Sequence, residues 1–293
     1  MEYLLEKNIL KNILKNILIK KMKIGACIRV KDEQNIICDW VRYYLHIGFD
    51  KLIIYDNKSY PCVEKTLTNS NLYDKNRIEL IIDNFEGNGQ HIVYQEAIEN
   101  NKELDWLLLC DADEFIYIKN GNIKEFLNTF STDTCTILIN WVVFGSNKLK
   151  CLDTTKTIFQ HFIAREDYSH FWNRFPKSFI RPNLIERFGN VHTTSNLNYK
   201  TRNVYNEEIH YKNYPIDNEV IDYKLNDNTP VVIIHYMTLD LESMLKKREK
   251  NMKYNIGVDF INPKYTLQWY FGNSIQSFKD NNQDLRMIQY INN

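Results

Sequence analysis

The chain has 293 residues, 44% of them hydrophobic, and its 37 basic and 37 acidic residues leave a formal net charge of zero. This length can bury a large core as one domain, or as one domain with a small appendage. The balanced charge supplies no overall field that would attract nucleic acid, so we expect no nucleic-acid partner.

Residues 1–22 form an amphipathic, low-complexity extension. Residues 8–19 repeat Asn-Ile-Leu-Lys, which places Ile and Leu side chains on one face of a helix. Lysine interrupts every turn, so the segment is neither a transmembrane span nor the apolar part of a signal peptide. Three interpretations stay open: a helix packed on the domain or a partner, a low-complexity extension, or a helix lying on a membrane surface. With neither signal nor anchor, we expect a cytoplasmic protein.

From residue 23 on, short apolar runs alternate with amphipathic segments. The pattern predicts strands at 24–30, 51–55, 78–82 and 106–110, with helices at 35–47 and 90–101. This alternation is typical of an α/β fold with a mostly parallel central sheet flanked by helices. Ligands of such sheets bind beyond the carboxyl ends of the strands. Polar residues stand at or just after these strand ends: Arg29, Asp56, Asp83, Asp111 and Asp113.

The fourth of these strands ends in three carboxylates, Asp111, Asp113 and Glu114. Side chains alternate along a strand, so Asp111 and Asp113 are expected to point to one side, within reach of a single hard cation. Two carboxylates form an incomplete shell for Mg²⁺ or Mn²⁺, and an added imidazole would favour Mn²⁺. His235, at the end of a predicted strand over 231–234, is the candidate third ligand.

After residue 140 the alternation fades into a half that is rich in aromatic residues, histidine and arginine. Such a half suits a substrate-facing region with long loops. Trp141, Phe144 and Trp172 could stack on a face of the substrate, or could belong to the core. A strongly basic helix is predicted over 241–251.

Asp111-Ala112-Asp113 after an apolar strand resembles the metal-binding motif of GT-A-type glycosyltransferases. Further segments, in order over residues 24–252, are similar to glycosyltransferase family 92 and to related bacterial and viral family 2-like enzymes. These segments are Asp39-Trp40, Tyr55-Asp56-Asn57, Gln90 with Tyr94, Glu114-Phe115, Phe144-Gly145-Ser146, Lys177-Ser178, Arg181-Pro182 and His235-Tyr236.

The resemblance implies one GT-A-like (Rossmann-like nucleotide-diphospho-sugar transferase) domain over 23–293. Its nucleotide-binding half would be 23–140, its acceptor-binding half 141–260, and its C-terminal helices would lie in 261–293. It implies transfer of a hexose from a nucleotide sugar, commonly UDP-linked and with UDP-galactose as one candidate, to a hydroxyl of a glycan or protein. Animal members of the family are galactosyltransferases that act with inversion, and Mn²⁺ is the usual ion.

The resemblance also implies roles for individual residues. Asp111 and Asp113 would hold ribose and metal, and His235 would complete the metal shell. The other carried-over donor-site residues would line the nucleoside cleft (Arg29, Asp56, Asp83), approach the diphosphate or acceptor (Lys177, Arg181) or contact the phosphates (Lys246).

Inverting transfer also needs a carboxylate beside the acceptor hydroxyl as general base. Glu166 and Asp167, in a stretch of Arg, Tyr, His and Trp, are the candidates, and an exposed loop pair is the alternative.

Three other functions are alternatives to sugar transfer. A phosphatase with Asp111 as nucleophile would have threonine or valine where this chain has Phe115. A sugar nucleotidyltransferase would need a glycine-rich loop after the first strand, where only Gly25 occurs, inside the strand. A non-catalytic sugar- or nucleotide-binding protein of the same fold is the third.

Overall fold

The computed structural model describes residues 22–87, 89–185, 188–189, 192, 198–209, 225–253 and 282–290. The predicted N-terminal helix and most of the predicted C-terminal helical region lie outside these residues. Within 282–290 the chain forms a short strand, β11 (Asn282–Gln283), and a 3-10 turn, η4 (Ile288–Tyr290). No helix of the described part is both long and apolar enough to cross a membrane.

The first half alternates strands and helices as predicted, with element ends within two residues of the expected ones. In chain order the elements are β1 (Ile24–Val30), α2 (Ile37–His46), β2 (Lys51–Asp56), α3 (Val63–Asn69), β3 (Ile78–Ile82), α4 (Gln90–Asn100) and β4 (Trp106–Leu109). The helix α3 was not predicted.

The second half is richer in strands and short helices. Its elements are β5 (Glu114–Ile118), α5 (Ile123–Leu127), β6 (Thr134–Val143), α6 (Ile158–His161), β7 (Ala164–Arg165), η1 (Phe171–Arg174), β8 (Pro176–Ile180), η2 (Pro182–Leu184), β9 (Lys200–Asn203), β10 (Val231–His235) and α7 (Leu241–Lys253). The predicted strand and basic helix after residue 230 correspond to β10 and α7.

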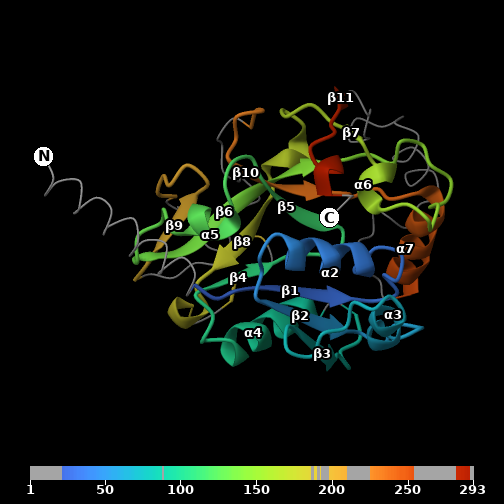
Figure 1. Ribbon diagram of the computed structural model, residues 1–293, viewed down its shortest axis with the longest axis horizontal. Helices are drawn as coiled ribbons and strands as arrows, with labels where there is room; N and C mark the ends of the chain where they lie inside the picture. Colours follow the sequence, from blue (N-terminus) through green and yellow to red (C-terminus); the bar gives the residue numbers. More distant parts are fainter. Residues whose placement is uncertain are drawn as a thin grey trace, which may run out of the picture.

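A nine-stranded sheet with the order β3-β2-β1-β4-β8-β6-β10-β5 runs through the molecule, and β9 also pairs with β6 (Figure 1). The strands β3, β2, β1 and β4 are mutually parallel, as are β6 and β10 and also β6 and β9. Antiparallel pairs join β8 to both β4 and β6, and β5 to β10. The expected mixed α/β architecture with a mostly parallel central sheet is confirmed.

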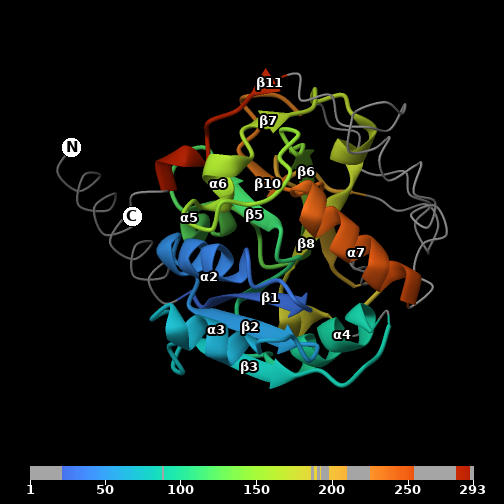
Figure 2. The same ribbon diagram turned by 90° about the vertical axis from the view of Figure 1, so that its right-hand side faces the viewer.

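Alternate residues of the parallel strands bury against opposite helical layers. Ile28 and Trp106 pack in the larger apolar cluster with Trp40 of α2, whereas Cys27 packs in the second cluster with Tyr94 of α4. Both faces of the strands are therefore covered, which explains why their sequences read as continuous apolar runs. Figure 1 shows α7 beyond the arrowheads of β1 and β2, and Figure 2 looks onto that edge of the sheet.

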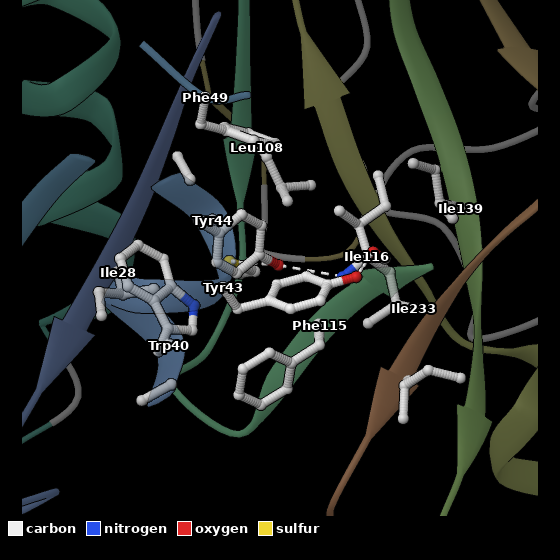
Figure 3. Packing of buried hydrophobic residues seen from close by; sticks show 14 of the residues in the cluster. Ile28, Trp40, Tyr43, Tyr44, Phe49, Leu108, Phe115, Ile116, Ile139 and Ile233 are labelled. Carbon is white, nitrogen blue, oxygen red and sulfur yellow. Dashed lines mark hydrogen bonds between the residues drawn. The ribbon is translucent and has the colours of Figure 1, made fainter. Parts of the chain in front are cut away.

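Two neighbouring tyrosines of α2 fasten β5 in place (Figure 3). The Tyr43 hydroxyl donates to the Ile116 carbonyl at 2.5 Å. The Tyr44 hydroxyl donates to the Glu114 carbonyl at 3.1 Å and accepts from the Ile116 amide at 3.2 Å. Phe115 packs edge-on against Tyr43, with ring centroids 5.4 Å apart. Because side chains alternate along a strand, burying Phe115 under α2 directs Glu114 to the opposite face of β5.

Candidate active site

The carboxylates expected at the end of the fourth strand lie in a tight turn, residues 111–114, which we call the acid turn. The strand β4 ends at Leu109, and the Glu114 amide donates to the Asp111 carbonyl at 3.1 Å. Strand alternation therefore does not orient Asp111 and Asp113, and the reasoning that placed both on one side of a strand was wrong. Their side chains meet different partners.

Asp111 is held by Lys177 and Gln90. The Lys177 ammonium donates to Asp111 Oδ2 at 2.6 Å, and the Gln90 amide donates to Asp111 Oδ1 at 2.6 Å. Lys177 Nζ also lies 3.4 Å from Glu114 Oε2, and its side chain is only 1% exposed. Burial alone would lower the pKa of Lys177, but Asp111 and Glu114 raise it above its ordinary value. Lys177 is therefore a buried, charged group that links two carboxylates.

Asp113 faces the other side of the turn. Its Oδ1 lies 3.6 Å from His235 Nε2, and its Oδ2 lies 3.5 Å from Lys247 Nζ. Burial favours a raised pKa, yet Lys247 and His235 hold the pKa of Asp113 below its ordinary value. The Asp113 carbonyl also accepts from the Tyr236 amide at 2.9 Å, which fixes the end of β10 beside the turn.

Glu114 is fully buried, and burial raises its pKa to about 7 despite the neighbouring Lys177. Asp113, Glu114 and His235 each offer one ligand atom, and these atoms lie within 4.8 Å of one another. Two carboxylates and an imidazole form a donor set that suits Mn²⁺. These three residues therefore fit a divalent ion. Asp111 lies next to the group, because Lys177 contacts both Asp111 and Glu114.

The predicted nucleoside-cleft residues Arg29 and Asp83 bind each other. Arg29 Nε donates to Asp83 Oδ2 at 2.5 Å, and the same guanidinium donates to the carbonyls of Phe85 and Gly87 at 2.8 Å each. The Asn57 amide donates to Asp83 Oδ2 at 2.9 Å. These contacts shape the loop that leads into α4, at the carboxyl ends of β1 and β3 where the pair was expected.

Asp56 also makes internal contacts at its strand end. Its two carboxylate oxygens accept from the backbone amides of Ser59 and Val63, at 2.8 and 2.9 Å. Asp56 therefore fixes the loop between β2 and α3.

Lys177 and Arg181 lie at opposite ends of β8. Because β8 runs antiparallel to β4, its first residues meet the last residues of β4. Lys177 therefore reaches the acid turn, whereas the Arg181 guanidinium stacks on Trp106, the first residue of β4, at 4.2 Å from the ring centroid. The structure does not bring Arg181 to the acid turn.

Of two adjacent lysines in α7, the structure brings Lys247 to the site. Lys246, the predicted phosphate contact, donates to Glu242 at 2.7 Å and is 67% exposed. Lys247, one position later, points at Asp113. The side chains of adjacent helix residues point in directions about 100° apart, so the rotation of α7 about its axis decides which of the two lysines faces the site.

Glu166 and Asp167 lie in different surroundings. Glu166 is buried, and its amide donates to the Val143 carbonyl at 3.3 Å. Val143 of β6 pairs with His235 of β10 in the sheet. The Glu166 backbone is therefore hydrogen-bonded to the residue that lies beside His235. Asp167 is exposed and accepts from the Ser169 amide and hydroxyl, which lowers its pKa. The exposed-loop alternative thus describes Asp167 but not Glu166.

Among the three aromatic residues suggested for sugar stacking, Trp141 contacts site residues. Its ring centroid is 4.4 Å from that of His235, and Lys177 Nζ lies 5.7 Å from the ring. Phe144 is buried in the core, and Trp172 packs on Phe175.

Sequence reasoning did not assign a role to Gln90, Glu114 or Lys247. The signal for Glu114 was its place directly after the Asp-Ala-Asp triplet.

Comparisons with known proteins agree on one family. A family model described as glycosyltransferase family 92 matches residues 23–257. A glycosyltransferase family 92 protein of Ricinus communis is 25% identical over 117 residues, which are 39% of this chain and 20% of that protein.

Solved structures with some likeness include TarS of S. aureus, with a TM-score of 0.35, 15% identity, and coverage of 56% of this chain and 48% of TarS. Another is glucosyl-3-phosphoglycerate synthase of Mycobacterium tuberculosis in complex with Mn²⁺ and UDP, with a TM-score of 0.30, 13% identity, and coverage of 42% and 45%. The chain thus spans less than half of each of these crystallised chains. Both scores are below 0.5, so nothing about ligands of this chain follows from them.

Proposed function

Because the chain belongs to glycosyltransferase family 92, we propose that it transfers a hexose from a UDP-linked donor to a hydroxyl of a glycan or protein, using a divalent ion at the acid turn. The buried group of Asp113, Glu114 and His235 carries this proposal, because each residue offers an atom that could hold a metal ion and these atoms lie within 4.8 Å of one another. Mn²⁺ is the preferred ion, given the imidazole in the donor set.

The charges at the acid turn support a site for a cation and a diphosphate together. Three carboxylates, Asp111, Asp113 and Glu114, are opposed by the ammonium groups of Lys177 and Lys247. With all three acids ionised and both lysines protonated, the group carries one net negative charge. A bound divalent ion would make the net charge positive and would stabilise negative charge on the departing β-phosphate.

The chain's own lysines have separate tasks in this proposal. Lys177 is buried and keeps Asp111 in place. Lys247 is 58% exposed, so its ammonium can move from Asp113 to a phosphate oxygen when the donor binds.

Glu166 is the preferred general base for an inverting transfer. It is the buried member of the Glu166–Asp167 pair, and its amide binds the carbonyl of Val143, the residue of β6 that pairs with His235. A carboxylate in that position can accept the proton of an acceptor hydroxyl. Glu166→Gln should abolish transfer while donor binding persists, and Asp167→Asn is the matched control. Equal loss in both variants, or in neither, would place the base elsewhere.

The direct test is hydrolysis of a panel of UDP-, GDP- and other nucleotide sugars with and without Mn²⁺. A transferase should release the nucleotide slowly from its donor, and the release should stop with chelator or with Asp113→Ala. A binding protein of the same fold would leave every nucleotide sugar intact. Metal-independent turnover by Asp113→Ala would refute the metal assignment.

A further inference from the structure

Two buried polar atoms face each other beside the acid turn. Glu114 Oε1 and His235 Nδ1 lie 3.7 Å apart, and neither has a hydrogen-bond partner among the described residues. Glu114 is fully buried and His235 is 6% exposed. Burying a polar atom without a hydrogen-bond partner is unfavourable, so two such atoms this close together indicate a contact that forms when the site binds its ligand.

The other carboxylate oxygen of Glu114 is already committed. Glu114 Oε2 accepts from the Asp111 amide at 2.9 Å and lies 3.4 Å from Lys177 Nζ. The Tyr44 hydroxyl holds the Glu114 carbonyl as well. With Oε2 fixed by two donors, the carboxylate cannot rotate freely, and Oε1 stays directed at the imidazole.

The His235 imidazole lies between two carboxylates, and these differ in the other hydrogen-bond partners that each can reach. Its Nε2 is 3.6 Å from Asp113 Oδ1, and Asp113 also has Lys247 as a partner and a side chain that is 10% exposed. Glu114 Oε1 has neither solvent nor another donor in the described part of the chain. The single proton of a neutral imidazole therefore gains more at Nδ1, where it satisfies Glu114, than at Nε2.

We propose that Glu114 does not bind the divalent cation itself but is a positioning residue. It holds the proton of His235 on Nδ1 and leaves the Nε2 lone pair directed at Asp113, so that Asp113 and His235 are the ligands within this group. The proposal rests on the proposed function only for the nature of that cation. A shortening of less than about 1 Å brings Nδ1 and Oε1 to hydrogen-bond distance. A carboxylate that orients a ligating histidine in this way typically changes metal affinity about 10–100-fold. The Trp141 ring, tilted by 60° to the imidazole with its centroid 4.4 Å away, limits rotation of the imidazole.

The nearly isosteric change Glu114→Gln makes a sharp test, because the amide has one acceptor and one donor end. The Asp111 amide and the Lys177 ammonium both require an acceptor at the Oε2 position. The glutamine oxygen is therefore expected there, which turns the NH₂ group toward His235 Nδ1. The imidazole must then accept at Nδ1 and carry its proton on Nε2, where the proton obstructs the cation site.

Nitrogen-15 NMR of the imidazole, in metal-free protein and in buffer alkaline enough for neutral imidazoles, reports the tautomer directly. We expect the Nδ1–H form in the native protein and the Nε2–H form in Glu114→Gln. A native Nε2–H form would overturn the proposal, and so would an unchanged tautomer in a folded variant. The native spectrum alone decides the question if the variant does not fold.

Titration with Mn²⁺ alone supplies the second readout. Affinity should fall about 10–100-fold in Glu114→Gln, and His235→Ala should cost little more in that background because the two residues act as a unit. Glu79→Gln, which alters a glutamate on β3 paired with Lys51 at 2.9 Å, is the control and should leave affinity unchanged. Additive losses would show that Glu114 acts independently of His235, against the proposal. The Nδ1–H tautomer in a protein that binds no Mn²⁺ would refute the metal-dependent function and leave the positioning role standing.

Discussion

Replacing Lys177 by methionine would leave the inner end of the acid turn without its buried ammonium group. Lys177 is 1% exposed and lies 2.6 Å from Asp111 Oδ2 and 3.4 Å from Glu114 Oε2. Removing one partner of a buried ion pair typically costs about 3–5 kcal/mol. The Asp111 side chain remains 36% exposed, so water can replace part of the lost interaction, whereas Glu114 is fully buried. We therefore expect a loss at the lower end, about 3 kcal/mol in the free energy of unfolding.

The pH dependence of that loss identifies its cause. The pKa of Glu114 is raised to about 7 by burial, and Lys177 opposes that rise, so the pKa climbs further in the variant. In Lys177→Met, protonation of Glu114 removes a buried negative charge that no longer has its ammonium partner. The stability difference between native protein and Lys177→Met should therefore be largest well above pH 7 and should shrink as the pH falls toward 7. Below that pH Glu114 is protonated in both proteins, and the difference should level off.

Urea unfolding of both proteins in chelator, at several pH values, measures this difference. Lys51→Met is the matched control, because Lys51 is 29% exposed and pairs with Glu79 at 2.9 Å; we expect a loss of no more than about 1 kcal/mol there. Added Mn²⁺ should stabilise Lys177→Met more than the native protein, since the acids without their ammonium attract the cation more strongly. A difference that is independent of pH, together with equal stabilisation by Mn²⁺, would refute the reasoning.

Three further changes test other parts of the site. Lys247→Met should raise the dissociation constant for UDP-sugar about tenfold in a calorimetric titration, whereas the exposed neighbour Lys246→Met should leave it unchanged. The pKa of His192 is lowered to about 4 by burial and by Lys177, against an ordinary value near 6.5, so the unfolded chain binds more protons between these pH values. Native stability relative to His192→Asn should consequently fall as the pH drops from about 6.5 to 4, by up to about 3 kcal/mol, and a flat difference would contradict this assignment. Tyr44→Phe should cost about 1–3 kcal/mol in thermal unfolding by leaving the Ile116 amide without its partner. Tyr73, a partly buried tyrosine at the edge of the larger apolar cluster, is the control, and Tyr73→Phe should cost less than about 0.5 kcal/mol.

The first half of the fold could be predicted because each parallel strand is buried on both faces. Such strands appear in the sequence as uninterrupted apolar runs, and amphipathic segments of helical length separate them. The same logic placed Arg29 and Asp83 at the carboxyl ends of β1 and β3. It could not predict that the two residues bind each other, because their contact spans 54 residues and depends on the strand order.

The direction of β8 explains why two residues of one predicted motif separate. Lys177 and Arg181 were assigned together, but an antiparallel strand brings only its first end to the carboxyl edge of β4. Strand direction depends on connections through residues that carry no periodic signal. Helix phase has the same effect in α7, where a one-residue shift exchanges Lys246 for Lys247.

The position of His235 beside the acid turn follows from the length of β6. Residues Thr136–Asn140 of this strand pair with β8, and Trp141–Val143 pair with β10. A single ten-residue strand thus joins the parallel sheet that ends at the acid turn to the strands that carry the imidazole. Pairing of His235 with both Val143 and Glu114 then fixes which residues of β5, β6 and β10 lie side by side. A slip of one residue would turn the imidazole to the opposite face of the sheet. The geometry of the proposed metal site is therefore a property of strand register, and variants that shorten the apolar run of β6 should lose Mn²⁺ affinity before they unfold the parallel strands β1–β4.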